Sequence, residues 1–343
     1  MKILFELSHP KHYYQFRCII KLLINEGHDV NVVARDKDVL LTILKEDSCN
    51  YLIYGHHGRS ILSKFIVLPI LLYKYYNIVN KINPDIIVSK ASPYAAIIGW
   101  FFNLKTIIAP DSEIVQLTKL FVAPRSSIII TPSGYSIDYG NKHMRFNGFF
   151  EDCYLHPSVF TPRKDLVANM GIDISLPYFI LRFISWTANH DINKYGFSYT
   201  DKIDIVNLLK KYGKVYISSE EKLPTDLEKY KLKIPASKVH DVLHFATMYI
   251  GDSQTMATEA ALLGTPAIRY NSFVGPNDMS NFIFLEKKYK LLRNFSEIND
   301  VKACINEFIT NPNNKKQWLM KRRKYYSATN NVNSTIKKYI LDA

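Results

Sequence analysis

The sequence predicts an α/β protein with two domains, each built on a parallel β-sheet. Its 343 residues are about twice the usual length of one domain. Short β-rich apolar runs alternate with stretches of helical period in both halves of the chain, as they do in βαβ units. A segment with Pro157, Pro162 and Pro177 interrupts this alternation, and we expect a linker over residues 156–177.

The first domain is expected over residues 1–155. Its strands are the apolar runs ILFEL (3–7), VNVVA (30–34), YLIY (51–54), DIIVS (85–89) and TIIA (106–109). Helical periodicity lies near residues 13–25, 36–46, 60–82 and 93–102. Because ligands bind outside the carboxyl ends of parallel strands, the loops that follow these strands are the places to look for a site.

The second domain is expected over residues 178–313. Its strands are YFILRFI (178–184), KVYIS (214–218), MYIGD (248–252) and PAIRY (266–270), with helices near residues 200–212 and 255–263. Basic helices over residues 314–343 follow this sheet, and we expect them to pack back on the first domain.

Composition indicates an ordinary globular protein, since 47% of the residues are apolar and 22% are charged. The cysteines are too scattered for a zinc ribbon and are expected to be free thiols of a reducing cytosol; they are Cys18, Cys49, Cys153 and Cys304. The longest apolar run, residues 65–73, is too short to span a bilayer, which needs about 20 residues. The first residues do not resemble a signal peptide, so a cytoplasmic location is expected.

The net charge of +13 favours an anionic partner. The basic residues are dispersed and no nucleic-acid-binding module is recognisable, so nucleic acid is not expected as a partner. Residues 61–82 and 315–326 mix apolar and basic side chains. Each is either a packed helix or a helix that lies flat on an anionic membrane surface.

The sharpest local signal is GDSQTMATEAALLGTP, residues 251–266. A strand ends at Asp252, a small polar turn follows, and an Ala-rich helix begins. Ser253 or Thr255 can cap this helix, whose first N–H groups and dipole favour an anion such as a diphosphate. Glu259 lies about one turn further on, where it can accept both hydroxyls of a ribose. The competing interpretation is a well-capped helix with a surface glutamate.

This stretch resembles the nucleotide site of GT-B glycosyltransferases and of the non-hydrolysing UDP-N-acetylglucosamine 2-epimerases. The chain as a whole is similar to an uncharacterised bacterial and archaeal family of that superfamily. The matching segments occur in the right order: LSHPKHYYQF (7–16), GHDVNVVARD (27–36), YGHHGRSILSK (54–64), SKASPYAA (89–96), APDSE (109–113), FNGFFEDCYLHPSVFTP (146–162) and RFISWTANHD (182–191).

The resemblance implies a GT-B fold, in which two Rossmann-like domains face a central cleft and the C-terminal domain holds a nucleotide sugar. The expected nucleotide-sugar residues are Arg182, His190, Ser253, Gln254, Thr255 and Glu259. The turn would bind the diphosphate and Glu259 the ribose. Either Arg182 or His190 then neutralises a phosphate, or Arg182 is a strand residue whose charge reaches solvent.

The acceptor would bind to the N-terminal domain, at His9, Lys11 and Arg35. The candidates for the catalytic base are His12, Asp111 and Glu113. A histidine of near-neutral pKa can take a proton from an acceptor hydroxyl, and the acidic pair competes for that role. An inverting transfer needs such a base and a retaining transfer does not, and the sequence leaves both outcomes open.

The leading hypothesis is a metal-independent glycosyltransferase that uses a nucleotide sugar, UDP-linked, in the synthesis of a surface polysaccharide or glycoconjugate. Its acceptor would be a glycan or a lipid-linked sugar, which suits a peripheral position on the inner face of the cytoplasmic membrane. Neither a metal ion nor another cofactor is expected, because the turn amides and a cation such as Arg182 would stabilise the departing diphosphate without one. The alternative is a sugar-nucleotide 2-epimerase, with Asp111, Glu113 and His190 as acid and base groups.

Overall fold

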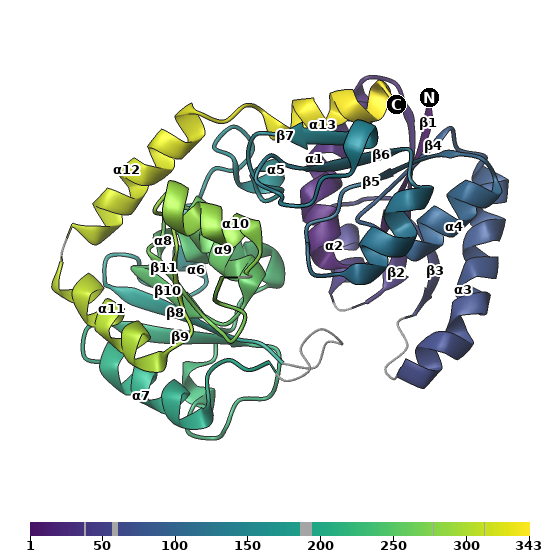
Figure 1. The fold of residues 1–343 in the computed structure, drawn as a ribbon. Coiled ribbons are helices and arrows are strands. Elements are labelled where there is room, and N and C mark those ends of the chain that lie inside the picture. The colour runs from purple at the N-terminus through teal and green to yellow at the C-terminus, as the bar shows by residue number, and fades with distance from the viewer. Residues whose placement is uncertain (38, 57–60, 186–193, 277, 312) are drawn as a thin grey trace. The chain divides into compact units, whose positions relative to one another are not determined.

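The computed structural model describes residues 1–343 except 38, 57–60, 186–193, 277 and 312 (Figure 1). The chain forms two compact units. Unit 1 comprises Met1–Tyr154 and Thr329–Ala343, and unit 2 comprises Leu155–Ala328.

Unit 1 contains a sheet of seven parallel strands in the order β3-β2-β1-β4-β5-β6-β7. The strands are β1 (Lys2–Leu7), β2 (Asp29–Asp36), β3 (Leu52–His56), β4 (Ile86–Ser89), β5 (Lys105–Ile108), β6 (Ile128–Pro132) and β7 (His143–Phe146). In the centre, Phe5 of β1 lies opposite Val32 of β2 and Val88 of β4. The strand order reverses between β1 and β4, which is where ligands bind in doubly wound sheets.

Helices cover both faces of this sheet (Figure 1). They are α1 (Pro10–Asn25), α2 (Leu40–Glu46), α3 (Ile61–Ile82), α4 (Pro93–Phe101), α5 (Asp152–Leu155) and α13 (Val332–Leu341). On one face Phe5 packs against Phe16 of α1, with ring centroids 5.4 Å apart. On the other face Leu4 belongs to a core cluster with Leu71 and Tyr75 of α3.

Leu71, Tyr75 and Val79 of α3 therefore pack on the sheet, as the packed-helix interpretation of residues 61–82 requires. Its Ile70 and Tyr73 are exposed. Among the described helices, none has both the length and the hydropathy that a bilayer crossing requires.

Unit 2 contains five parallel strands in the order β12-β11-β10-β8-β9. They are β8 (Tyr178–Phe183), β9 (Lys214–Ser219), β10 (Met248–Gly251), β11 (Ala267–Tyr270) and β12 (Arg293–Phe295). Its helices are α6 (Lys164–Asn169), α7 (Tyr199–Leu209), α8 (Val239–Phe245), α9 (Gln254–Leu262), α10 (Ser280–Ile283), α11 (Ile298–Thr310) and α12 (Asn314–Ser327). The order reverses between β8 and β10, so the loops after these two strands flank the switch point of this sheet.

The helices after residue 313 divide between the units. In unit 2, α12 is anchored by Trp318, whose Nε1 donates to the Leu291 carbonyl at 2.7 Å. In unit 1, α13 packs against α1 and β7. Its Asn333 Nδ2 donates to the Cys153 carbonyl at 2.9 Å, and its Tyr339 hydroxyl to the Arg145 carbonyl at 2.8 Å.

The predicted fold class, α/β with two parallel sheets, is confirmed. The sequence patterns did not predict β6, β7, β12, α5, α6, α10 or α11. Strand β7 reads HMRF and β12 reads RNF; both lie at sheet edges, where one side of the strand has no neighbour and a continuous apolar run is not required. Helix α6 lies within residues 156–177 and packs against α8.

Candidate functional site

Unit 1 gathers ionisable side chains at the carboxyl edge of its sheet, around the β1–β4 switch point. Lys11 and His12 follow β1, Lys90 follows β4, Asp111 follows β5 and Glu151 follows β7. We call these five residues the unit 1 cluster. They come from four loops that are far apart in the sequence, and the parallel arrangement of the strands brings these loops to one edge.

Lys11 joins the two carboxylates of the unit 1 cluster. Its Nζ lies 3.1 Å from Asp111 Oδ2 and 3.1 Å from Glu151 Oε1. Burial lowers the pKa of Lys11, but Asp111 and Glu151 outweigh that effect and hold it above its usual value. Burial likewise raises the pKa of Asp111, but Lys11 and Lys90 outweigh it and hold that pKa well below the usual range. Both groups are therefore charged at neutral pH.

His12 lies in the first turn of α1. Burial lowers its pKa well below the usual value, and His9 lowers it further. The Ser8 N–H donates to His12 Nδ1 at 3.4 Å, which assigns the ring proton of the neutral form to Nε2. His9 is the N-cap of the same helix, and its Nδ1 accepts the N–H of Lys11 at 3.1 Å.

Lys90 is nine-tenths buried, with 8% of its surface exposed. Among the residues that the structure describes, its Nζ has no hydrogen-bond partner. It lies 3.2 Å from the centroid of the Phe150 ring. Burial lowers the pKa of Lys90 to about 8 against the opposing effect of Asp111 and Glu151, while Lys11 lowers it further.

Two other predicted residues lie apart from the ion pairs of the unit 1 cluster. Glu113 accepts a hydrogen bond from the Ser136 N–H. Arg35 ends β2 with its guanidinium 5.3 Å from the centroid of the Tyr94 ring. It is near the buried Glu6, which accepts from the Tyr54 hydroxyl and whose pKa is raised by burial.

Thr131, His143 and Asp138 are arranged like a hydrolase triad, with 2.7 Å between Thr131 Oγ1 and His143 Nε2 and 3.2 Å between His143 Nδ1 and Asp138 Oδ1. Thr131 is fully buried, and its hydroxyl also donates to the Pro132 carbonyl. The hydroxyl is thus engaged by two partners on β6 and β7, and these contacts fix β6 against β7.

In unit 2, close packing at Gly251 and hydrogen bonds of Asp252 and Ser253 fix the turn between β10 and α9. A Cβ added to Gly251 would lie 2.4 Å from the Tyr249 hydroxyl and 2.8 Å from the Arg182 carbonyl oxygen. Asp252 Oδ1 accepts the Ile184 N–H at 2.9 Å, which ties the turn to the end of β8. Ser253 is the N-cap of α9, with its hydroxyl accepting the Met256 N–H at 3.4 Å. Of the two predicted caps, the structure has Ser253.

The next two residues, Gln254 and Thr255, are only half-buried. Their N–H groups belong to the first turn of α9, where a helix provides no acceptor of its own. These N–H groups can hydrogen-bond an anion, and the helix dipole would contribute about 0.3–1 kcal/mol to its binding.

Glu259 lies one turn further along α9 and is 6% exposed. The surface-glutamate interpretation is therefore wrong. Its Oε1 lies 3.1 Å from Nε2 of His240, on α8. His240 is itself 4% exposed. Because both side chains are buried, each fixes the orientation of the other.

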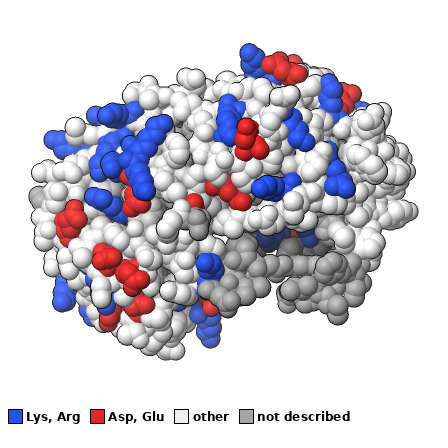
Figure 2. Space-filling view, viewed as in Figure 1, with Lys and Arg blue, Asp and Glu red and all other residues white. Residues whose placement is uncertain are grey.

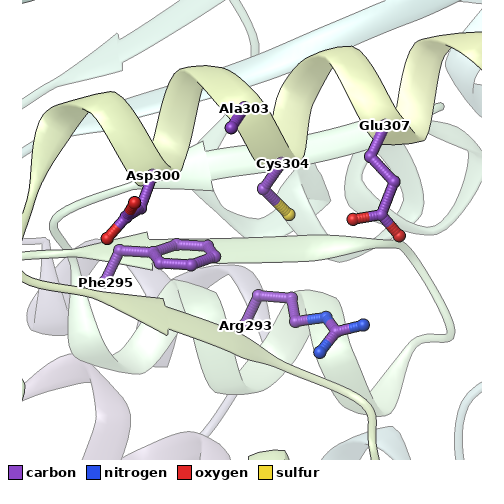
Figure 3. A pocket seen from close by; sticks show the side chains of 6 residues that line it. All are labelled: Arg293, Phe295, Asp300, Ala303, Cys304 and Glu307. Atoms are coloured by element: carbon purple, nitrogen blue, oxygen red, sulfur yellow. The ribbon is translucent and has the colours of Figure 1, made fainter.

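Arg182 lies on β8 and is paired rather than solvated. One nitrogen of its guanidinium lies 2.6 Å from Glu220 Oε1, and the other donates to the Ser218 hydroxyl at 2.8 Å. The remaining predicted residue of this set, His190, lies outside the described residues. A shallow pocket of about 330 Å³ lies elsewhere in unit 2, between β12 and α11, and no predicted site residue lines it (Figure 3).

Sequence reasoning missed Lys90, Glu151, His240 and Glu220. His240 could have been found, because it lies on the helix that directly precedes the strand leading to the turn. Lys90 and Glu151 lie in the quoted segments SKASPYAA (89–96) and FNGFFEDCYLHPSVFTP (146–162), but no local pattern indicated a role for them, and Glu220 lies in none of these segments. Among the residues described, no group of three His, Cys, Asp or Glu side chains is arranged to hold a metal ion.

The sequence matches no protein-family model and no curated protein, but solved structures match the fold. UDP-GlcNAc 2-epimerase from Neisseria meningitidis, bound to UDP-GlcNAc, has a TM-score of 0.66 at 11% identity, over 100% of this chain and 99% of that chain. UDP-GlcNAc 2-epimerase from Methanocaldococcus jannaschii has a TM-score of 0.63 at 13% identity, over 91% and 94%. Spinosyn rhamnosyltransferase SpnG, complexed with thymidine diphosphate, has a TM-score of 0.63 at 10% identity, over 99% and 100%.

The chain has the GT-B fold. At these identities the similarity establishes the architecture alone. Within this GT-B fold, the two sets of polar residues lie at the switch points of their sheets.

Proposed function

We propose that the chain is a glycosyltransferase that takes a sugar from a nucleotide donor, UDP-linked, and transfers it to the hydroxyl of a glycan or lipid-linked acceptor. The observation that carries the proposal is the tip of α9. It combines a glycine-dependent turn, a Ser253 cap and half-buried first residues at the β8–β10 switch point. The bound UDP-GlcNAc and thymidine diphosphate of two similar structures support a nucleotide sugar as the ligand.

In this proposal the amides of the turn hold the diphosphate and stabilise the negative charge that develops on it as it leaves. Arg182 supplies the positive charge. Because Arg182 is paired with Glu220, the diphosphate would replace one anionic partner with another. Glu259 would accept the ribose hydroxyls, and His240 would keep its carboxylate in position.

The acceptor would bind at the unit 1 cluster, where Lys11, Asp111 and Glu151 offer charged donors and acceptors. These groups suit a hydroxylated sugar. His9 and Arg35 would contact parts of the acceptor further from the reacting hydroxyl.

A sugar-nucleotide 2-epimerase is the second candidate. The unit 1 cluster favours it, since epimerisation at C2 requires proton transfer by acid and base groups. Two of the similar structures are UDP-GlcNAc 2-epimerases. Incubation of the chain with UDP-GlcNAc in deuterated water separates the two functions, because deuterium enters C2 without an acceptor only if the chain is an epimerase.

An anionic membrane surface is proposed as a further partner, through one face of α12. Lys316, Met320, Arg323 and Lys324 recur on this face at helical spacing, and Met320 is 60% exposed. Figure 2 shows Lys and Arg side chains gathered over α12. A basic face with an exposed apolar residue suits the headgroup region of an anionic bilayer.

Thermal denaturation with and without UDP, UDP-GlcNAc or thymidine diphosphate tests the proposed function. A ligand present at a hundred times its Kd stabilises the folded state by about 2.7 kcal/mol, which raises the melting temperature by several degrees. No rise with any nucleoside diphosphate or nucleotide sugar removes the proposal.

A further inference from the structure

We propose that Lys90, to which its segment SKASPYAA (89–96) assigns no role, is the residue that takes the proton from the acceptor hydroxyl. The inference rests on the proposed transfer function and assigns the base of that reaction. It starts from the position of Lys90 at the β1–β4 switch point, beside Lys11 and Asp111.

The backbone holds Lys90 in this place. The Ser89 hydroxyl accepts the N–H of Ser92, and Ser92 caps α4 by accepting the N–H of Ala95 at 3.4 Å. Ala91 lies between them with a φ of 72°, in the left-handed region that a residue with a Cβ seldom adopts. Strain of this kind is concentrated at functional sites.

The side chain of Lys90 is buried without an acceptor for its N–H groups among the described residues. Its contact is with the Phe150 ring, 3.2 Å from Nζ to the ring centroid, and with the more distant Phe16 ring at 6.0 Å. A buried amine without a hydrogen bond is costly. A substrate hydroxyl would provide the missing partner, with its O–H donating to the neutral amine.

The groups that face Lys90 come from every neighbouring element. Asp111 and Glu151 are anionic, Lys11 is cationic, His12 is a buried imidazole whose pKa the Lys90 charge helps to lower, and Cys153 of α5 is a buried thiol. Burial and Lys11 disfavour the ammonium form, whereas the two carboxylates favour it. The result is a pKa of about 8, and a general base works best when its pKa is close to the ambient pH.

The predicted bases fit this task less well. Asp111, with a pKa held far below the usual range, is a weak base. His12 has a lowered pKa, and its Nδ1 already accepts the Ser8 N–H. Glu113 accepts the Ser136 N–H instead.

The step balances as follows. The neutral Lys90 amine takes the proton of the acceptor hydroxyl while that oxygen forms a bond to the anomeric carbon of the donor sugar. The bond from this carbon to the diphosphate breaks, and the nucleoside diphosphate leaves with the electron pair. Asp111 and Glu151 stabilise the new ammonium group, which then returns its proton to solvent.

The test is the pH dependence of UDP-GlcNAc turnover by the full chain, with water as the acceptor. The wild-type rate is expected to rise with pH around an apparent pKa near 8 and then level off. In Lys90→Arg, which keeps the charge but does not deprotonate, and in Lys90→Gln, the rate at the plateau should fall by about 100-fold or more and the rise should disappear. Lys21→Gln, at an exposed position of α1, is the matched control.

Thermal denaturation shows that each variant is folded and whether it still binds UDP. A Lys90→Arg variant that keeps the wild-type rate and pH profile overturns the inference, because a permanent positive charge at this position would then support the full rate without proton transfer. A wild-type chain without turnover at any pH also overturns it. If UDP still raises the melting temperature in that case, nucleotide binding survives and only the role of Lys90 is lost.

Discussion

His240 and Glu259 form a buried hydrogen bond between α8 and α9, with His240 Nε2 3.1 Å from Glu259 Oε1. The two residues are 4% and 6% exposed. The bond positions a carboxylate one helical turn beyond the N-terminus of α9, where we propose that the diphosphate binds. It also makes that carboxylate part of the core, so its substitution affects both stability and binding.

Glu259→Gln and Glu259→Ala are expected to separate these two effects. The glutamine keeps an oxygen that can accept from His240, so the melting temperature without ligand should stay close to that of the wild type. The alanine leaves the His240 ring without this partner and should lower the free energy of unfolding by about 1–3 kcal/mol. Both variants should lose most of the thermal shift that UDP produces.

Glu221→Gln provides the control for that experiment, since Glu221 is exposed in unit 2. Its thermal shift with UDP should equal that of the wild type. A full UDP shift in Glu259→Gln would show that this carboxylate does not hold the nucleotide.

Gly251→Ala is expected to distort the turn before α9. The new Cβ would lie 2.8 Å from the Arg182 carbonyl oxygen, which is backbone and cannot rotate away. Such overpacking costs about 1–3 kcal/mol, and the UDP shift should shrink because the amides of the turn are displaced. Gly275→Ala is the matched control, since an added Cβ there meets no atom within 4 Å. Equal melting temperatures for the two variants would show that the turn is adaptable.

Local patterns predicted most of the buried strands of both sheets, although not β6, and they predicted a cap at Ser253 or Thr255, of which the structure has Ser253. Such strands read as apolar runs, and a cap acts on N–H groups two or three residues away. The unit 1 cluster was only partly predictable. Lys11, Asp111 and Glu151 meet because β1, β5 and β7 are parallel and end at one edge, and no local pattern records which loops become neighbours.

His244 should make unit 2 less stable in acid. Burial is the main cause that lowers its pKa from 6.5 to about 4, and Lys315 lowers it further. The unfolded chain therefore binds a proton at His244 before the folded chain does. The stabilising contribution is complete above about pH 6.5 and is lost as the pH falls towards 4.

Denaturant unfolding of the wild type and of His244→Gln at about pH 7 and about pH 4.5 measures this effect. The wild type should lose about 2–3 kcal/mol more than the variant between these pH values. Because other groups titrate alike in both proteins, their contribution cancels in the difference between the wild type and the variant. Equal losses in the two proteins would mean that the folded state protonates His244 without penalty.

The basic face of α12 should bind vesicles that contain anionic lipid. The cations of this face, Lys316, Arg323 and Lys324, are all exposed. Cations gathered on one helix face gain free energy when an anionic surface approaches. Sedimentation with phosphatidylcholine vesicles, with and without phosphatidylglycerol, should therefore show binding only to the anionic vesicles, and added salt should weaken it.

The triple variant Lys316→Glu, Arg323→Glu, Lys324→Glu should abolish this binding, since each basic residue near the surface contributes about 1 kcal/mol. The control reverses an equal number of exposed charges elsewhere in unit 2, at Lys210, Lys211 and Lys214. Because both variants change the net charge equally, a general effect of charge would weaken both to the same extent. Loss of binding in the α12 variant alone locates the contact on that helix. If the wild-type chain instead binds single-stranded nucleic acid more tightly than anionic vesicles, the face serves a different partner.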